Sequence, residues 1–125
     1  MSPAILDKGA LIAFERNERR VVAIVVRALE HHDPLLVPAC VVAQAWRDGT
    51  RQTRLARLLG SPLCEVLVLD DRQARAAGQL CGVAGSNDVV DASVAIVGRE
   101  RGARVITSDP DDLRRLDPRL ELVTI

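Results

Sequence analysis

The sequence predicts an α/β fold, a three-layer α/β/α sandwich with a mostly parallel central sheet. Short apolar runs alternate with longer stretches of helical periodicity along the whole chain. This alternation is typical of strands joined by crossover helices. The chain has 125 residues without a repeat or a linker rich in Pro, Gly or Ser. A chain of this length forms one hydrophobic core, so we expect a single domain over residues 1–125.

In the first half, the run PAILD ends in an acid and predicts a buried strand. Val21, Val25 and Leu29 repeat every four residues, which favours a helix, and Asn17 is a candidate cap for it. The expected elements are a strand at residues 3–7, helical stretches at 10–14 and 18–32, a strand at 35–37, a helix entered at or just after Pro38, and a basic helix at 51–59.

In the second half, the break at residues 60–62 is followed by CEVLVLD, which predicts a second buried strand. An alanine-rich helix follows and is expected to end at Gly82 or Gly85. The remaining expected elements are a helix containing DASVAIVGRERG, a strand at residues 104–107, a short helix started by Pro110, and a final strand in LELVTI.

The composition excludes several classes of protein. Apolar residues make up 48% and charged residues 27%, which is typical of a globular domain and not of a disordered chain. The charges cancel, 17 basic against 17 acidic, which argues against a protein that coats nucleic acid without specificity. No apolar run approaches the ~18 residues of a membrane span, and no basic leader precedes Asp7. We therefore expect no membrane segment, no signal peptide and a cytoplasmic location.

The cysteines and histidines do not predict a zinc site. Cys40, Cys64 and Cys81 are odd in number and widely spaced, which indicates reduced thiols rather than disulfides. His31 and His32 are adjacent, so their side chains diverge, and no thiol lies nearby in sequence.

Four aspartates are candidate functional residues. Asp7 ends the first predicted strand and Asp109 follows the strand ARVIT, and ligands of parallel sheets gather outside the carboxyl ends of strands. Asp88 and Asp91 are three residues apart near the start of a helix, so both project from one face. Helix capping is the alternative for Asp7, Asp88 and Asp109. Capping does not explain Asp91, which lies one turn inside the helix and is followed by apolar residues. An acid on or near the buried side of such a helix needs a partner.

Carboxylates that converge in one cleft repel each other unless a cation neutralises them. A site made only of oxygen ligands suits Mg²⁺ or Mn²⁺ rather than zinc or copper. The chemistry that such an ion favours is hydrolysis of a phosphodiester.

The chain resembles the PIN-domain family, specifically its small VapC-like toxin ribonucleases, over essentially its whole length. The resemblance lies in ILDKGALIAF at Asp7, DASVAIVGRERGA at Asp91 and VITSDPDDL at Asp109. It implies a PIN-like sandwich and a Mg²⁺- or Mn²⁺-dependent endoribonuclease that is the toxin of a toxin–antitoxin pair. The metal would be held by Asp7, Asp91 and Asp109, aided by Asp88. The implied partners are RNA, a small antitoxin and a second copy of the chain.

Gln44 departs from the family pattern. The family places a glutamate in a context such as VxAEVxR, whereas this chain has VVAQAWR. Glutamine keeps an oxygen donor but loses the charge, so it would attract Mg²⁺ less. The alternative function is therefore a PIN-fold binding or regulatory module with weak or no activity. A receiver-like phosphoacceptor domain is a third alternative. Such a domain has a pair of acidic residues after its first strand, and that pair is missing here because Asp7 is followed by Lys8 and Gly9.

Other residues could contact the substrate. Thr107 and Ser108 directly precede Asp109 and could hold a water or a phosphate oxygen, or could simply make local hydrogen bonds. The spaced arginines after Gln44 form either an edge that follows an RNA backbone or a solvated helix face. The members of this series are Arg47, Arg51, Arg54 and Arg57.

Overall fold

The computed structural model describes residues 2–125 and confirms the predicted fold class. One five-stranded sheet has the order β3-β2-β1-β4-β5, and every pair of neighbouring strands is parallel. Its strands are β1 (Ala4–Leu6), β2 (Leu35–Pro38), β3 (Cys64–Leu67), β4 (Arg104–Thr107) and β5 (Leu122–Thr124).

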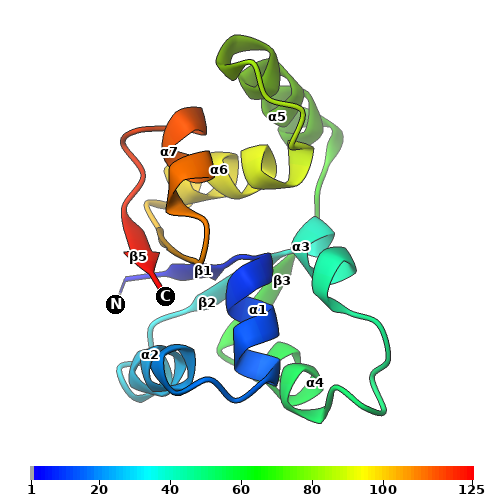
Figure 1. Cartoon of the computed structure of the whole chain (residues 1–125), viewed down its shortest axis with the longest axis vertical. Coiled ribbons are helices and arrows are strands. Elements are labelled where there is room, and N and C mark those ends of the chain that lie inside the picture. Colours follow the sequence, from blue (N-terminus) through cyan, green and yellow to red (C-terminus); the bar gives the residue numbers. More distant parts are fainter. Residues whose placement is uncertain (1) are drawn as a thin grey trace.

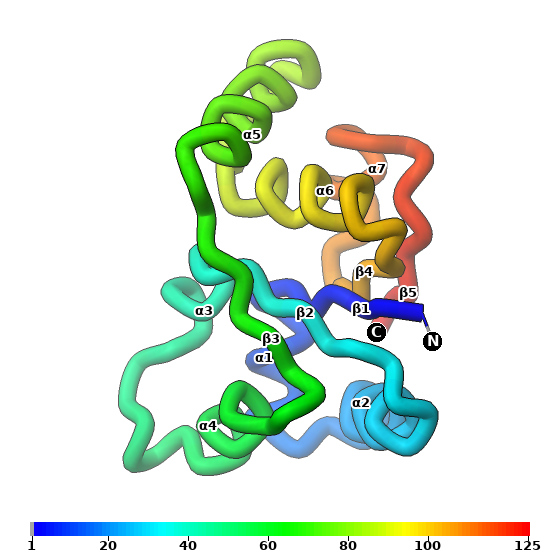
Figure 2. The backbone as a smooth tube through the Cα atoms, turned by 180° about the vertical axis from the view of Figure 1, so that it is seen from behind, coloured from blue at the N-terminus to red at the C-terminus, as the bar shows by residue number. Residues whose placement is uncertain are grey.

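Helices lie on both sides of this sheet (Figure 1). Helices α1, α2 and α4 lie below it in that view, α5, α6 and α7 lie above it, and α3 follows β2 directly. Figure 2 shows the same three layers from behind. The helices are α1 (Lys8–Glu15), α2 (Arg19–Glu30), α3 (Ala39–Ala45), α4 (Thr53–Leu59), α5 (Asp71–Ala84), α6 (Val89–Arg101) and α7 (Pro110–Leu116).

The central strand β1 is buried along its whole length because helices cover both faces of the sheet. Ile5 and Leu6 are fully buried, as are Val105 and Ile106 of the neighbouring β4. Strands enclosed on both faces are continuously apolar rather than alternating, which is why a run such as AIL predicts a strand here.

No single helix among residues 2–125 is long and apolar enough to cross a bilayer. Helices α5 and α6 reach the length and apolar composition of a span only when taken together, and this pair is bent by 110°.

The third strand differs from its prediction. β3 forms as expected but lies at the edge of the sheet, and Glu65 and Val66 are exposed rather than buried. The segment after it leaves Val68 79% and Leu69 42% exposed. Apolar side chains alone do not distinguish a central strand from an edge strand with an uncovered face, because the local sequence does not encode which neighbours arrive.

Two local predictions near helix ends also need correction. Asn17 does not cap α2; the N-cap is Glu18, and Asn17 adopts a left-handed φ of 60° in the turn after α1. Asparagine tolerates that conformation better than most residues. The basic helix begins at Thr53, because the side chain of Gln52 accepts hydrogen bonds from the backbone of Arg47 and Asp48 and holds the preceding segment as a loop.

The connectivity changes direction beside β1. The chain proceeds from β1 to β2 and β3 on one side, and β4 and β5 are added on the other. Ligands of open parallel sheets bind at such a switch point, outside the carboxyl ends of the strands. Asp7 follows β1 there, and Asp109 follows β4 by one intervening residue.

Candidate active site

Three of the predicted aspartates are the N-caps of helices that start at the carboxyl edge of the sheet. Asp7 caps α1 and accepts a 2.9 Å hydrogen bond from the Ala10 N–H. Asp88 caps α6 and accepts one of 2.9 Å from the Asp91 N–H. Asp109 occupies the N-cap position of α7 without using its side chain as a cap. The capping explanation thus accounts for one oxygen of Asp7 and one of Asp88, and not for the Asp109 carboxylate.

Thr107 connects two of these aspartates. Its Oγ1 accepts a 2.9 Å hydrogen bond from the Asp109 N–H, and its hydroxyl is also hydrogen-bonded to the Asp7 side chain. Burial raises the pKa of Asp7, the bonds from Thr107 and Ala10 oppose this rise, and the charge of Asp109 adds to it. Thr107 is fully buried, so it orients Asp7 and is not exposed to a substrate. Ser108 is exposed and lines a hollow that runs along residues 108–112.

Asp91 is the most perturbed carboxyl group of the site. Burial together with the charge and side-chain hydrogen bond of Asp88 raises its pKa to about 7, and the charges of Asp7 and Asp112 contribute. No ion pair found among residues 2–125 involves Asp91. A half-buried acid that lacks a cation and is surrounded by other acids is a strong candidate for a functional group.

Two hollows share Asp112 and are lined by three of the predicted aspartates, Asp88, Asp91 and Asp109; Asp7 lines neither of them. One, of about 270 Å³, lies between the first turn of α6 and α7 and includes Asp88, Asp91, Asp112 and Arg115. The other, of about 250 Å³, runs along residues 108–112. Asp112 is not among the four aspartates that the sequence singled out as candidates. Its position three residues after Asp109, on a short helix starting at the sheet edge, is the signal that could have identified it.

Gln44 lies half-buried on α3 and does not line either hollow. It is one turn beyond Cys40, whose thiol is hydrogen-bonded to Ser93 of α6. Cys40 and Ser93 mark the point where α3 approaches α6, whereas α3 packs mainly on α1, β2 and β3.

The predicted arginine edge does not gather at this cleft. Arg47 folds back and donates to the carbonyls of Ala43 and Trp46, and Arg51 faces Asp48 at 3.7 Å. Arg54 lines a different, apolar groove. The loop that separates α3 from α4 breaks the helical spacing on which the series depends.

The chemistry of these donors fits a hard divalent cation, but the carboxylates are not preassembled around one. Among residues 2–125, no group of three acidic, histidine or cysteine side chains is arranged closely enough to hold a metal ion. The donors are all oxygen atoms, and the raised pKa values of Asp7 and Asp91 reflect burial and mutual repulsion, which a cation would relieve. Asp109 makes no capping bond that would prevent its side chain from turning inward.

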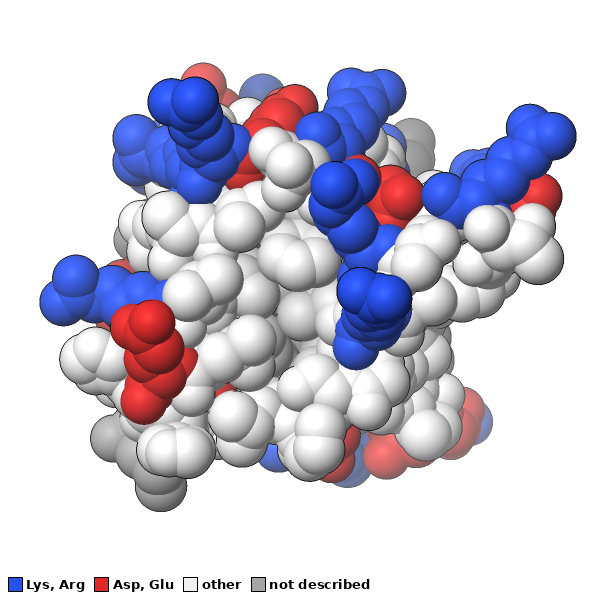
Figure 3. All heavy atoms as spheres, turned by 90° about the horizontal axis from the view of Figure 1, so that it is seen from below, with Lys and Arg blue, Asp and Glu red and all other residues white. Residues whose placement is uncertain are grey.

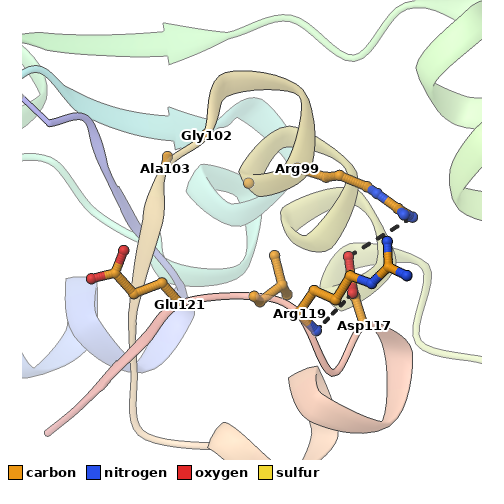
Figure 4. A pocket seen from close by; sticks show the side chains of 8 residues that line it. Arg99, Gly102, Ala103, Asp117, Arg119 and Glu121 are labelled. Atoms are coloured by element: carbon orange, nitrogen blue, oxygen red, sulfur yellow. Dashed lines mark hydrogen bonds and ion pairs between the residues drawn. The ribbon is translucent and has the colours of Figure 1, made fainter.

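Another hollow, of about 300 Å³, lies between the end of α6 and the segment before β5 (Figure 4). Its buried acid, Asp117, faces Arg99 at 4.0 Å and accepts a 2.9 Å hydrogen bond from the Arg119 N–H (Figure 4). The negative charge of Asp117 is balanced by Arg99, so this hollow does not contain a cluster of unpaired acids.

The family model of the PIN domain matches residues 4–118, so the chain belongs to the PIN domain family. No curated protein matches the sequence.

Solved structures of similar fold cover nearly the whole chain. FitAcB from Neisseria gonorrhoeae has a TM-score of 0.67 and 19% identity over 97% of this chain and 96% of its own. FitAB bound to the IR36 DNA fragment has a TM-score of 0.69 and 18% identity over 97% and 94%. VapBC2 from Rickettsia felis, bound to a DNA fragment from its promoter, has a TM-score of 0.72 and 14% identity over 98% of each chain.

Proposed function

We propose that this protein is a metal-dependent endoribonuclease and the toxin component of a toxin–antitoxin pair. The observation that carries the proposal is the group of mutually repelling carboxylates at the switch point of a PIN fold, with the pKa of Asp91 raised to about 7. Membership of the PIN family supports hydrolysis of nucleic acid, and the VapBC and FitAB neighbours support the toxin–antitoxin context.

Asp7, Asp91 and Asp109 would hold Mg²⁺ or Mn²⁺, with Asp88 beside them. The ion would polarise a phosphate and lower the pKa of a water. The chain itself supplies the positioning: Ala10 and Thr107 fix Asp7 by hydrogen bonds, and the backbone of Asp91 holds Asp88. Groups already held by packing and hydrogen bonds do not need to be ordered during the reaction.

Cleavage of RNA by the wild-type chain and by Gln44→Glu, assayed with Mn²⁺ and with EDTA, tests this function. We expect wild-type cleavage that EDTA abolishes and a faster rate for Gln44→Glu, because the added carboxylate strengthens attraction for the ion. If only Gln44→Glu cleaves RNA, the protein is instead a PIN-fold binding module, the alternative that Gln44 motivates.

A separate apolar groove supports an antitoxin partner. Phe14 of α1, Val22 and Leu29 of α2 and Leu58 of α4 line a hollow of about 300 Å³, with Arg54 and Arg57 also lining it. Figure 3 shows the underside of the molecule as a largely uncharged surface, bordered mainly by basic side chains with some acidic ones between them. The groove fits an amphipathic segment with apolar anchors and flanking acids.

The contact between α1 and α4 maintains this groove. The side chain of Glu15 accepts a 2.7 Å hydrogen bond from the Leu55 N–H at the start of α4. Co-purification with the product of a short adjacent reading frame tests the partner. We expect R54E/R57E to lose the partner while retaining the fold, because both side chains are exposed. Undiminished co-purification of that variant would place the antitoxin elsewhere.

Self-association and location remain predictions. The exposed Val66, Val68 and Leu69 at the β3 edge support a homodimer, since such edges rarely stay uncovered. The cytoplasmic location expected from the sequence is part of the same proposal.

A further inference from the structure

Arg115 is the one cation among the residues that line the two acidic hollows. It lies three residues after Asp112 on α7, so both side chains project from the face that lines the hollow beside α6. Arg115 is exposed. Arg115 takes part in none of the ion pairs found among residues 2–125, so its guanidinium has no carboxylate partner there.

The preceding residue provides the contrast. Arg114 has the same charge and occupies the same turn of α7, but its guanidinium faces Asp111 at 3.4 Å and does not line the cleft. Of these two adjacent arginines, only Arg115 lines an acidic hollow and lacks a carboxylate partner among the ion pairs of residues 2–125.

A nucleic-acid strand that enters this cleft meets Asp88, Asp91 and Asp112, all of which repel its phosphates. A guanidinium matches two oxygens of one phosphate, and an arginine without a carboxylate partner can bind that phosphate without first breaking an ion pair. We propose that Arg115 binds a backbone phosphate of the strand and is a substrate-binding residue of this site. This assignment rests on the proposed nuclease function.

The test compares Arg115→Gln and Arg115→Lys with the matched control Arg114→Gln. Cleavage kinetics on single-stranded RNA are expected to show KM raised about tenfold in Arg115→Gln. We expect Arg115→Lys to be intermediate, since it keeps the charge and loses the paired geometry. Binding of a fluorescein-labelled single-stranded RNA is measured in Ca²⁺ at NaCl concentrations between about 50 and 200 mM. The salt slope, which is the slope of the logarithm of the binding constant against the logarithm of the salt concentration, is expected to be about 0.7 smaller in magnitude for Arg115→Gln than for the wild type.

The outcomes separate this inference from the function on which it rests. Equal KM values and equal salt slopes for Arg115→Gln and Arg114→Gln would overturn the assignment while wild-type cleavage still supported a nuclease. A change in kcat with an unaltered salt slope would also overturn it, because it would show a counter-ion for the carboxylates rather than a phosphate contact. Absence of wild-type cleavage would refute the nuclease and the assignment together.

Discussion

The side chain of Asp88 accepts a hydrogen bond from the backbone N–H of Asp91, at 2.9 Å, within the first turn of α6. This bond stabilises the helix start and at the same time places two carboxyl groups next to each other. Their proximity is one cause of the raised pKa of Asp91. A local capping interaction thus contributes to the electrostatics of the site.

Replacing Asp91 with asparagine should abolish metal-dependent cleavage of RNA. The loss should exceed the roughly 10–100-fold effect typical of residues that only support metal ligands. Asp71→Asn is the matched control, because Asp71 also lies in the first turn of a helix but is exposed and paired with Arg75 at 3.0 Å. RNA cleavage by both variants, with circular dichroism to verify folding, checks this. Retained activity in Asp91→Asn would remove Asp91 from the mechanism.

The metal-free protein should lose stability as the pH rises from about 4 to about 7. The pKa of Asp91 is raised from 3.8 to about 7 by burial and neighbouring acids, and that of Asp7 is raised as well. The folded state therefore binds more protons than the unfolded state in this window, and the stability they contribute is lost as the pH passes the folded pKa.

In EDTA at pH 8, Asp91→Asn should consequently be more stable than the wild type. We expect a gain on the order of 1 kcal/mol after allowing for solvent screening at a half-buried site. Urea denaturation at pH 5 and pH 8 measures it, and the gain should shrink at the lower pH. An equal gain at both pH values would show that ionisation of Asp91 is not the cause.

Gly9→Ala should disturb the contact between α1 and the loop after β4. A β-carbon at Gly9 would collide with the Ser108 hydroxyl, and the Ser108 β-carbon would stand only 3.0 Å away. We expect a loss of about 1–2 kcal/mol and slower cleavage, because Asp7 and Asp109 flank this contact. Gly78→Ala is the control, since its β-carbon meets open space and alanine favours a helix interior. Thermal melts of both variants, and of Gly9→Ala/Ser108→Ala, should show partial recovery in the double variant.

Val68→Asp should convert a homodimer into a monomer without unfolding the chain. Val68 is 79% exposed beside the edge strand, so a charge costs little in the monomer and much in an apolar interface. Val26→Asp is the control, because Val26 is 45% exposed on α2, away from β3. Light scattering after size exclusion measures the mass of both variants. A mass for Val68→Asp equal to that of the wild type would exclude this edge from any dimer.

Much of the site could be anticipated because its residues follow local rules. A strand that ends in Asp7, a helix that carries Asp91 near its start and a strand followed by Asp109 are all visible as short motifs. Parallel strands bring such residues to one edge whatever their separation in sequence. Asp112 and Arg115 follow Asp109 by three and six residues on α7. The packing of α7 beside α6 decides that both line the same hollow as Asp91.

Two predictions differ from the structure, one for a local reason and one for a long-range reason. The arginine series assumed one continuous helical face, but the hydrogen bonds of Gln52 interrupt it. The strand at Cys64–Leu67 has the apolar residues of a central strand and occupies an edge. The loop comes from the Gln52 hydrogen bonds within the segment itself, whereas the edge position of β3 is decided by the order of strands in the sheet.

From its amino-acid order alone the chain specifies an alternation of strands and helices, because apolar periodicity and capping residues act over a few neighbouring positions. The assembly of the folded chain determines the order β3-β2-β1-β4-β5, the convergence of α1, α6 and α7 at one sheet edge, and the pKa of Asp91. These properties arise from burial and from charges brought together across the fold, and such interactions depend on distance in space rather than on separation along the chain.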